Sequence, residues 1–339
     1  MKNRIATIAL LGVPLFLAGC PGPNNSIDPM AKEIRAPKSA PAVPKPIKEP
    51  ISEELRVRAK SVIDEMLASN DAFIRANAVE AIQNTVGKEG AASIKQALND
   101  PQPVVRFAAA MASGTLQLPQ TKSTLWEMAN ADTDPSVRVA ARYGLHRLGD
   151  TRLSHDLEKS AVDVNKAVRA NTAMVLGRLG EPTAVNVLRT MVNDRERAVR
   201  IQVFEALWRL GDDQGLENLV ASSVSQAPDD QIIATIALAE PRDQRVSGPV
   251  YSNLVSDYVE TSLAAARAMG MLGSDAGYTI AQGGTRSPDP RIKVMAALAL
   301  GAIGRSDAQP SLTRLLGDQN PNVQLAAATA ILQLKPPKV

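Results

Sequence analysis

Self-similarity at a fixed interval is the feature that most constrains this chain of 339 residues. A short motif, in which an apolar residue precedes an arginine and small or apolar residues follow it, recurs every 31 or 32 residues. Its arginines are Arg75, Arg106, Arg138, Arg169 and Arg200. The pattern is blurred around Ile233 and Ser262 and returns clearly at Lys293 and Gln324, which makes nine units. Units of this length cannot enclose a core alone, so they must stack on their neighbours.

Each unit is expected to hold two antiparallel helices. Apolar residues at −1, +3, +7 and +10 relative to the arginine predict an amphipathic helix, which we name the first-type helix. Asp134-Pro135 and Asp289-Pro290 are typical of helix starts. A second apolar helix follows in each unit, named the second-type helix. Glycines that end the first-type helix stand at +11 in five units: Gly149, Gly180, Gly211, Gly273 and Gly304.

The combined motif, Asp-x-x-Val-Arg-x-x-Ala-Ala-x-Ala-Leu-Gly-x-Leu-Gly, resembles the HEAT-repeat family in its short form, first described in phycobilisome bilin lyases. This resemblance implies an all-α fold, an α-solenoid of about nine helix-pair repeats with a period of about 31 residues, spanning residues 51–339. The array begins with a second-type helix at 52–68 and ends with a first-type helix at 322–334. We expect these half-repeats to cap an open stack. The motif residues are structural, and the family has no common active site.

The first 20 residues are typical of a secretory signal peptide. Lys2 and Arg4 precede an apolar run that is too short for a membrane span of about 20 residues. The segment Leu17-Ala18-Gly19-Cys20 resembles the lipobox of bacterial lipoproteins. This resemblance implies removal of residues 1–19 and lipidation of Cys20, including palmitate, which would anchor the chain to the outer membrane or to the outer face of the inner membrane. The alternative is an ordinary secretory signal with an incidental cysteine.

Residues 20–50 form a predicted linker between the anchor and the repeats. Eight prolines lie among few apolar residues, so the segment cannot bury enough surface to offset its ordering entropy, and we expect it to be disordered. A plain spacer and a ligand for a proline-binding domain both remain open.

Charge and residue types exclude several classes of function. The net charge is +3; without Lys2 and Arg4 it is +1, and the linker contributes +2, which leaves −1 for residues 51–339. A nucleic-acid partner is not expected, because such proteins carry a basic excess. One cysteine and two histidines, His146 and His155, give little material for a metal site or a nucleophilic pair. We therefore expect no metal, no cofactor, no small-molecule substrate and no enzyme activity, although catalysis by carboxylates alone stays open.

The row Arg75, Arg106, Arg138, Arg169 and Arg200 has two interpretations. It could bind an anionic ligand, or each guanidinium could pair with a carboxylate of the loops at the helix starts, in its own or the neighbouring unit. The second is favoured, because aspartates precede the arginines by four or six residues.

A partner-binding site is suggested by the irregular stretch 221–260. It lacks the arginine and the glycines of the repeat, and Pro228, Pro241 and Pro249 are expected to interrupt its helices. Either this stretch has decayed neutrally or it has been reshaped for contact, since Trp, Tyr and Arg often dominate interface energies. The candidate residues are Trp208, Arg242, Arg245, Tyr251 and Tyr258. For Trp208, filling the core is the alternative, and Trp126 is also expected in the core.

The leading hypothesis is a membrane-anchored scaffold or adaptor that holds a protein partner at the bacterial cell envelope, in a groove formed by the second-type helices. One rival is a bilin-lyase-like enzyme or enzyme subunit. Another is a purely structural spacer in an envelope assembly.

Overall fold

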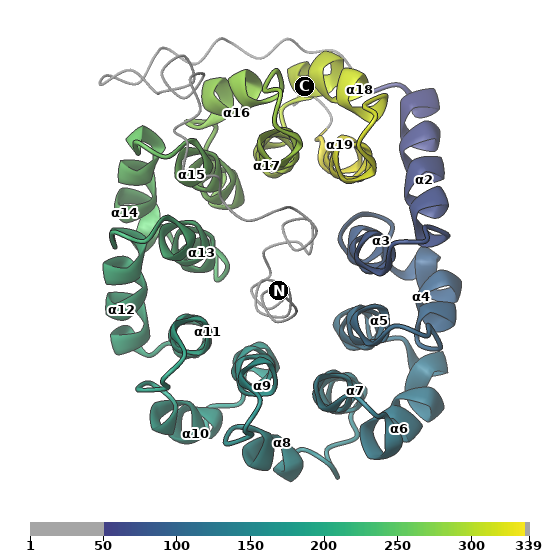
Figure 1. The fold of residues 1–339 in the computed structure, drawn as a ribbon, viewed down its shortest axis with the longest axis vertical. Coiled ribbons are helices and arrows are strands. Elements are labelled where there is room, and N and C mark those ends of the chain that lie inside the picture. Colours follow the sequence, from purple (N-terminus) through teal and green to yellow (C-terminus); the bar gives the residue numbers. More distant parts are fainter. Residues whose placement is uncertain (1–50, 336–339) are drawn as a thin grey trace. The chain divides into compact units, whose positions relative to one another are not determined.

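The computed structural model describes residues 51–335, and this range contains helices and no strand (Figure 1). The predicted all-α solenoid is confirmed for these residues. The predicted signal peptide, Cys20 and the proline-rich linker lie outside the described residues.

Nine first-type helices alternate with nine second-type helices along the described chain. The first-type helices are α3 (Ala72–Thr85), α5 (Pro103–Thr115), α7 (Pro135–Arg147), α9 (Lys166–Leu179), α11 (Arg197–Arg209), α13 (Pro228–Ala239), α15 (Val259–Met271), α17 (Pro290–Ile303) and α19 (Pro321–Gln333). The second-type helices are α2 (Glu53–Leu67), α4 (Ala91–Ala97), α6 (Lys122–Ala131), α8 (His155–Ser160), α10 (Ala184–Thr190), α12 (Asp213–Ser223), α14 (Ser247–Ser252), α16 (Tyr278–Gly284) and α18 (Gln309–Leu316). The nine-unit repeat expected from the sequence is therefore present.

The described chain divides into two compact units by its contacts. Unit 1 is residues 67–218, and unit 2 is residues 51–66 together with residues 219–335. Within each unit, the first-type helices lie on the inner side of the curve that the chain follows and the second-type helices on the outer side (Figure 1). The prediction that second-type helices line a binding groove is thus wrong, because the inner side of each unit is formed by the first-type helices.

Helix α2 packs with the C-terminal end of the chain. Leu55, Ala59 and Ile63 of α2 are buried, and Arg56 Nη2 donates a hydrogen bond of 3.4 Å to the carbonyl of Leu334. These atoms belong to residues 278 positions apart, and both lie in unit 2. The N-terminal half-repeat is therefore joined to the C-terminal one and does not cap unit 2 by itself.

The helix starts and ends follow the sequence signals. Asp134 Oδ1 accepts hydrogen bonds from the backbone N–H groups of Ser136 and Val137 at 2.7 and 3.3 Å, and Pro135 is the first residue of α7. The five predicted terminal glycines all have a positive φ, between 75° and 84°. This left-handed conformation is strained for residues with a Cβ, so glycine is needed at these turns.

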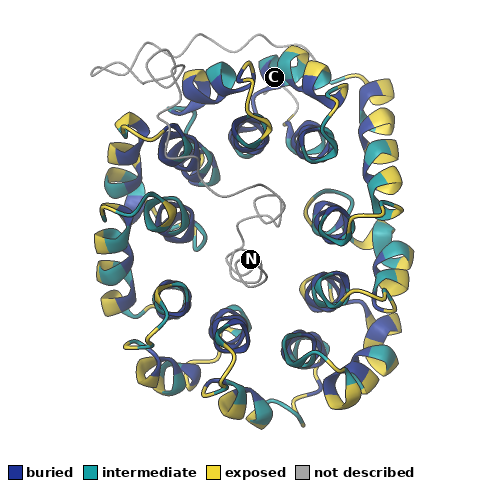
Figure 2. Ribbon diagram, viewed as in Figure 1, coloured by how far each residue is buried: buried dark blue, intermediate teal, exposed yellow. Residues whose placement is uncertain are grey.

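The core lies between the two layers of each unit, where Figure 2 shows the buried residues, while exposed residues line the loops and the outward faces of the second-type helices. Neighbouring first-type helices pack closely. A Cβ added at Gly177 of α9 would lie 2.6 Å from the Cα of Ala206 in α11. The glycines at the +8 position thus let adjacent backbones approach within a distance that any side chain would prevent.

Candidate protein-interaction surface

The arginine position ties the start of each first-type helix to the loop before it. Its side chain donates a hydrogen bond to the backbone carbonyl six residues earlier, in eight of the nine units. The pairs are Arg75–Ser69, Arg106–Asp100, Arg138–Asp132, Arg169–Asp163, Arg200–Asp194, Gln231–Ser225, Ser262–Ser256 and Gln324–Asp318, at 2.5 to 3.2 Å. Glutamine and serine can replace arginine in this bond, because one N–H or O–H donor is enough.

Three of the five arginines also reach the loop of the following unit. Arg169 Nε and Nη2 donate to the two carboxylate oxygens of Asp194 at 2.6 and 2.9 Å. The pair is nearly buried, with side-chain exposures of 8% and 9%. Arg75–Asp100 and Arg106–Asp132 repeat this bidentate geometry. We name these pairs the ion-pair ladder; Lys293 and Asp318 make a single contact of 2.7 Å at the same position in unit 2.

The ladder shifts the titration of its aspartates. The hydrogen bond from Arg169 holds the pKa of Asp194 below its ordinary value of 3.8, against the opposing effect of burial. For Asp100 and Asp132, burial raises the pKa, but the hydrogen bonds from the guanidinium and the backbone together lower it by more. Both pKa values are therefore also below the ordinary value. These carboxylates are therefore ionised in the folded chain at neutral pH.

Two arginines depart from the ladder. Arg138 makes the carbonyl bond to Asp132, and among the described residues it has no ion pair. Arg200 makes the carbonyl bond to Asp194, but the following loop has Ser225 at the position that Asp100, Asp132 and Asp194 hold in the ladder. Hence the carboxylate partners come from the next unit, 25 or 26 residues later, and the aspartates four or six residues before each arginine do not supply them.

Trp208 is buried, with 3% of its surface exposed. It stands at the +8 position of α11, where four other units have glycine. The burial agrees with the core-filling alternative and leaves no surface for a partner. His155 is exposed near Glu158, and His146 Nε2 lies 3.7 Å from Glu181, so the two histidines sit at separate places.

The irregular stretch keeps the helical repeat. Pro228 is the first residue of α13, Pro241 lies just beyond the C-cap residue of that helix, and Pro249 is in the first turn of α14. Proline is tolerated at these positions, because the N–H groups of a first turn have no partner within the helix. The expectation that these prolines interrupt the helices is therefore wrong.

Neutral hydrogen bonds replace the ladder in this stretch. Asn253 Nδ2 donates to the carbonyl of Ser223 at 3.1 Å and to Thr235 Oγ1 at 2.8 Å, and all three residues are buried. Thr261 Oγ1 donates to Gln231 Oε1 at 3.1 Å. These neutral bonds join the end of α12 and helix α13 to the segment that follows α14 and to α15.

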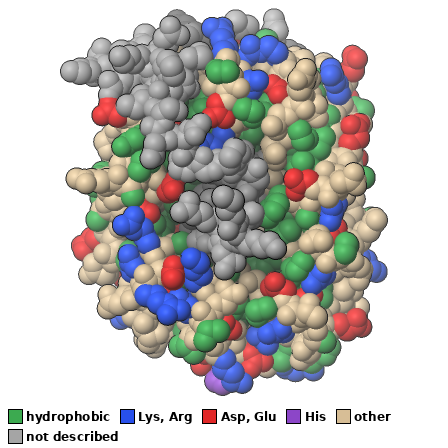
Figure 3. All heavy atoms as spheres, in the orientation of Figure 1, with side chains coloured by type: hydrophobic (Ala, Val, Ile, Leu, Met, Phe, Trp, Pro, Cys, Tyr) green, Lys and Arg blue, Asp and Glu red, His purple; other side chains and the backbone are tan. Residues whose placement is uncertain are grey.

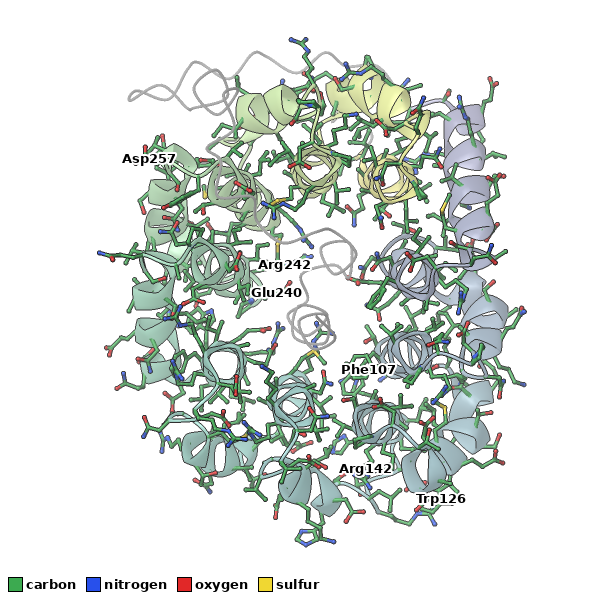
Figure 4. All side chains as sticks on the ribbon, viewed as in Figure 1. Phe107, Trp126, Arg142, Glu240, Arg242 and Asp257 are labelled. Atoms are coloured by element: carbon green, nitrogen blue, oxygen red, sulfur yellow. The ribbon has the colours of Figure 1, made fainter. Side chains whose placement is uncertain are left out.

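The predicted partner residues of this stretch lie at the two ends of α14. Arg242 and Arg245 precede the helix, and Arg245 forms an ion pair of 3.0 Å with Asp243. Tyr251 and Tyr258 lie at and beyond its C-terminal end. Figure 4 shows Arg242 on the inner side of α13, far from Asp257, the neighbour of Tyr258 in the sequence. The structure thus separates the arginines from the tyrosines.

Exposed apolar side chains gather around the two loops that precede α13 and α15. Tyr251 and Tyr258 are each 43% exposed, Val224 is 61% exposed and Val255 is 48% exposed. The bond between Asn253 and Ser223 brings the two loops together, so the valines belong to one surface. We name these four residues the unit 2 edge.

The corresponding loops of unit 1 are charged. Asp100, Asp132 and Asp194 hold the position that Ser225 and Ser256 hold in unit 2. Exposed valines do occur in unit 1, at 162 and 164, but both lie in one loop; the adjacent loops have Ala131 and Asn193 at the position of Val162, and Thr133 and Arg195 at the position of Val164. A continuous apolar edge of neighbouring loops is therefore a property of unit 2 among the described residues.

The two valines of this edge were not predicted from the sequence. Val224 and Val255 both stand seven residues before the arginine position, so the aligned repeats place them at one site.

Trp126 was predicted in the core, but its ring is only half-buried. Arg152 stacks over the ring, with its guanidinium carbon 4.2 Å from the ring centroid. An exposed cation over the ring explains how a tryptophan stands at the surface of α6.

None of the described helices has the length and apolar character of a membrane span. Within residues 51–335, no group of histidine, cysteine and acidic side chains is arranged to hold a metal ion. Figure 3 shows acidic, basic and hydrophobic side chains mixed over the coloured part of the face in view.

Comparison with known proteins supports the repeat assignment. The pattern of HEAT repeats matches residues 59–146, 156–239 and 279–339, more than half of the chain. The unmatched residues 240–278 contain Arg242, Arg245, Tyr251 and Tyr258. No curated protein sequence is similar enough to be matched.

Solved structures share the repeat fold at low identity. Human deoxyhypusine hydroxylase in complex with glycerol is 19% identical over 73% of this chain and 96% of that chain, with a TM-score of 0.39. The CpcE–CpcF complex of phycocyanin lyase from Nostoc sp. PCC7120 is 18% identical over 71% and 95%, with a TM-score of 0.43. Kap121p bound to Nup53p is 13% identical over 79% and 36%, with a TM-score of 0.34. Values this low carry no argument about function.

Proposed function

Because the chain belongs to the HEAT-repeat family, we propose that it is a scaffold or adaptor that holds a protein partner at the bacterial cell envelope. The unit 2 edge is the observation that carries this proposal. Tyr251, Val255, Tyr258 and Val224 expose apolar surface on adjoining loops, whereas the same loops of unit 1 carry aspartates. Clustered exposed apolar residues are typical of contact sites in soluble domains.

The chemistry of the edge suits a folded protein with an apolar surface of its own. Tyrosine gives a large contact area at a small cost in conformational entropy, and its hydroxyl can bond at the rim of an interface. The loops carry Ser225 and Ser256 where five other units carry aspartate, so less charge has to be desolvated on binding. No catalytic step is part of the proposal.

The anchor is the second part of the proposal. Lipid on Cys20 would hold the chain at a membrane, and the proline-rich residues 21–50 could extend about 90 Å as polyproline II, at about 3.1 Å per residue. The repeats could then reach a partner away from the lipid surface.

The binding part is tested by quantitative co-purification from detergent-solubilised membranes. With Tyr251→Ala and Tyr258→Ala combined, capture of one defined protein should fall at least tenfold, about 1.4 kcal/mol. The matched control is Asn193→Ala with Arg195→Ala, in the corresponding loop of unit 1, and it should leave capture unchanged. Equal capture by the parent and both variants would contradict the proposal, as would equal loss in both variants.

Cys20→Ser tests the anchor separately. The variant should move from the membrane pellet to a soluble or unprocessed form, and metabolic palmitate labelling should vanish. Labelling that persists in Cys20→Ser would contradict lipidation at this residue, whatever the result for the unit 2 edge.

A further inference from the structure

The inner side of unit 1 carries a strip of residues at four-residue intervals along its first-type helices. In α5 these are Phe107, Met111 and Thr115, which share one helix face because their spacing is close to one turn. Figure 4 shows Phe107 on the side of α5 that faces away from α6. The strip therefore lies opposite the core between the two layers.

Adjacent helices join this strip into a continuous floor. Thr115 Oγ1 in α5 and Tyr143 Oη in α7 lie 3.2 Å apart, within hydrogen-bond distance. This contact brings the +9 position of one helix beside the +5 position of the next. The +5 positions of α5, α7 and α9 are Met111, Tyr143 and Met174, whose exposures are 4% to 5%, and the +5 position of α11 is Glu205, which is 2% exposed. They form a nearly buried, largely apolar floor beneath the +9 residues.

Three arginines occupy the +9 position on consecutive helices. They are Arg147 in α7, Arg178 in α9 and Arg209 in α11, each 31 residues from the next and each partly exposed. Arg209 pairs with Glu205 at 2.9 Å. Among the described residues, the guanidinium groups of Arg147 and Arg178 have no ion pair and no hydrogen bond, and Arg147 Nε is buried without a partner. A buried donor without an acceptor is costly, which points to a ligand that accepts its hydrogen bond.

A structural explanation covers only part of this row. Each arginine lies in the last turn of its helix, where the helix dipole stabilises a cation by about 0.3 to 1 kcal/mol. The dipole acts equally on every helix, yet the same position in unit 2 has Glu240, Met271 and Ala302. The dipole therefore does not explain why the arginines are restricted to three consecutive helices.

We propose that this inner strip of unit 1 binds an extended polypeptide segment that carries acidic side chains. Packed helices lie about 8 to 10 Å apart, and an extended chain advances about 3.3 Å per residue, so one acidic residue in every three matches the arginine spacing. Arg147 and Arg178 bind the carboxylates through the bidentate geometry that guanidinium favours. This site is separate from the unit 2 edge and does not depend on it.

The test is fluorescence anisotropy with the full-length protein in detergent at low salt. The probe is a labelled peptide of about twelve residues with glutamate at every third position and Ser and Gly between. Arg147→Gln with Arg178→Gln should weaken binding of this peptide at least tenfold, because both carboxylate contacts are lost. The matched control, Lys88→Gln with Arg195→Gln, removes the same charge from exposed positions of unit 1 and should change binding by less than about twofold.

A second peptide, with the same four glutamates placed side by side, separates a spaced site from general charge attraction. It should bind the parent at least fivefold more weakly than the spaced peptide. No binding of the spaced peptide to the parent would overturn the proposal. Equal binding of the two peptides, or equal loss in both double variants, would also overturn it, because it would reduce the effect to net charge.

Discussion

The repeat around Arg169 in unit 1 and the repeats around Gln231 and Ser262 in unit 2 have the same backbone plan with different side-chain chemistry. Each begins its first-type helix with a hydrogen bond from the arginine position to the carbonyl six residues earlier. Arg169 adds two bonds to Asp194 of the next unit. Gln231 and Ser262 add no charged contact, and neutral bonds around Asn253 join their loops.

This difference teaches which parts of the repeat the fold requires. The apolar positions and the carbonyl bond are kept in both regions, so they are sufficient to set the helix pair. The ion-pair ladder is dispensable for the backbone plan, and where it is absent the loops carry Val224, Val255 and Tyr258 on their surface. We interpret the ion-pair ladder as a source of stability and the unit 2 edge as a contact surface for a partner.

The largest expected effect is a difference in the free energy of unfolding between Arg169→Ala and Gln231→Ala. Arg169→Ala removes one member of a nearly buried ion pair and leaves the carboxylate of Asp194 without its partner, which typically costs about 3 to 5 kcal/mol. Gln231→Ala removes neutral hydrogen bonds and should cost about 1 kcal/mol. Chemical unfolding of both variants measures the difference.

Asp194→Asn is the matched control for the ladder, because it removes the charge and keeps the size of the side chain. It should destabilise the chain less than Arg169→Ala, since the cation of Arg169 keeps the carbonyl oxygens of Asp163 and Val164 as acceptors. If Arg169→Ala were as stable as the parent, the arginine row would not stabilise the fold, and the ligand-binding interpretation would be favoured.

Acid should loosen unit 1 loops before the loops of the irregular stretch. The pKa values of Asp100, Asp132 and Asp194 are lowered in the folded chain. Their contribution is therefore present above the ordinary value of about 3.8 and is lost as pH falls through the lowered pKa values. Hydrogen exchange between pH 5 and pH 3 should show earlier loss of protection at the starts of α5, α7 and α11 than at the starts of α13 and α15. Loss of protection at the same pH in all five helices would contradict the difference proposed between unit 1 and the irregular stretch.

The smallest expected effect comes from restoring a cap to unit 2. Tyr258 and Ala227 are N-cap residues of α15 and α13 without a side-chain cap bond, whereas Asp134 and Asp289 cap their helices. Tyr258→Asp should therefore raise stability by about 0.5 to 1 kcal/mol while weakening partner capture. Thermal unfolding and co-purification of the same variant measure both changes. Stronger capture by Tyr258→Asp would contradict a contact role for the tyrosine.

The sequence predicted the fold well because a repeat presents the same signal many times. The 31-residue spacing, the terminal glycines and Asp134 each act locally, and the structure has them as expected. The partner carboxylates could not be assigned in the same way. Asp194 is 25 residues from Arg169 and meets it only when the units stack.

The candidate site was predicted only in part, for a related reason. A tryptophan in place of glycine indicates extra bulk, but burial of Trp208 depends on the packing around it. Arg242 and Tyr258 are close in sequence, and a helix between them sets them at opposite ends. A valine by itself does not indicate a binding site. The exposure of Val224 and Val255 and their closeness to each other depend on how the loops fold.

Photo-crosslinking in intact cells at one repeat position tests the central claim most directly. The position seven residues before the arginine position holds Val224 and Val255 in the irregular repeats of unit 2, and Asn99, Ala131, Val162 and Asn193 in four repeats of unit 1. With a photoreactive amino acid at each position in turn, we predict one crosslinked protein species from 224 and 255 and none from 99, 131, 162 and 193. Crosslinks from the unit 1 positions alone, or from all six equally, would contradict a contact surface at the irregular repeats.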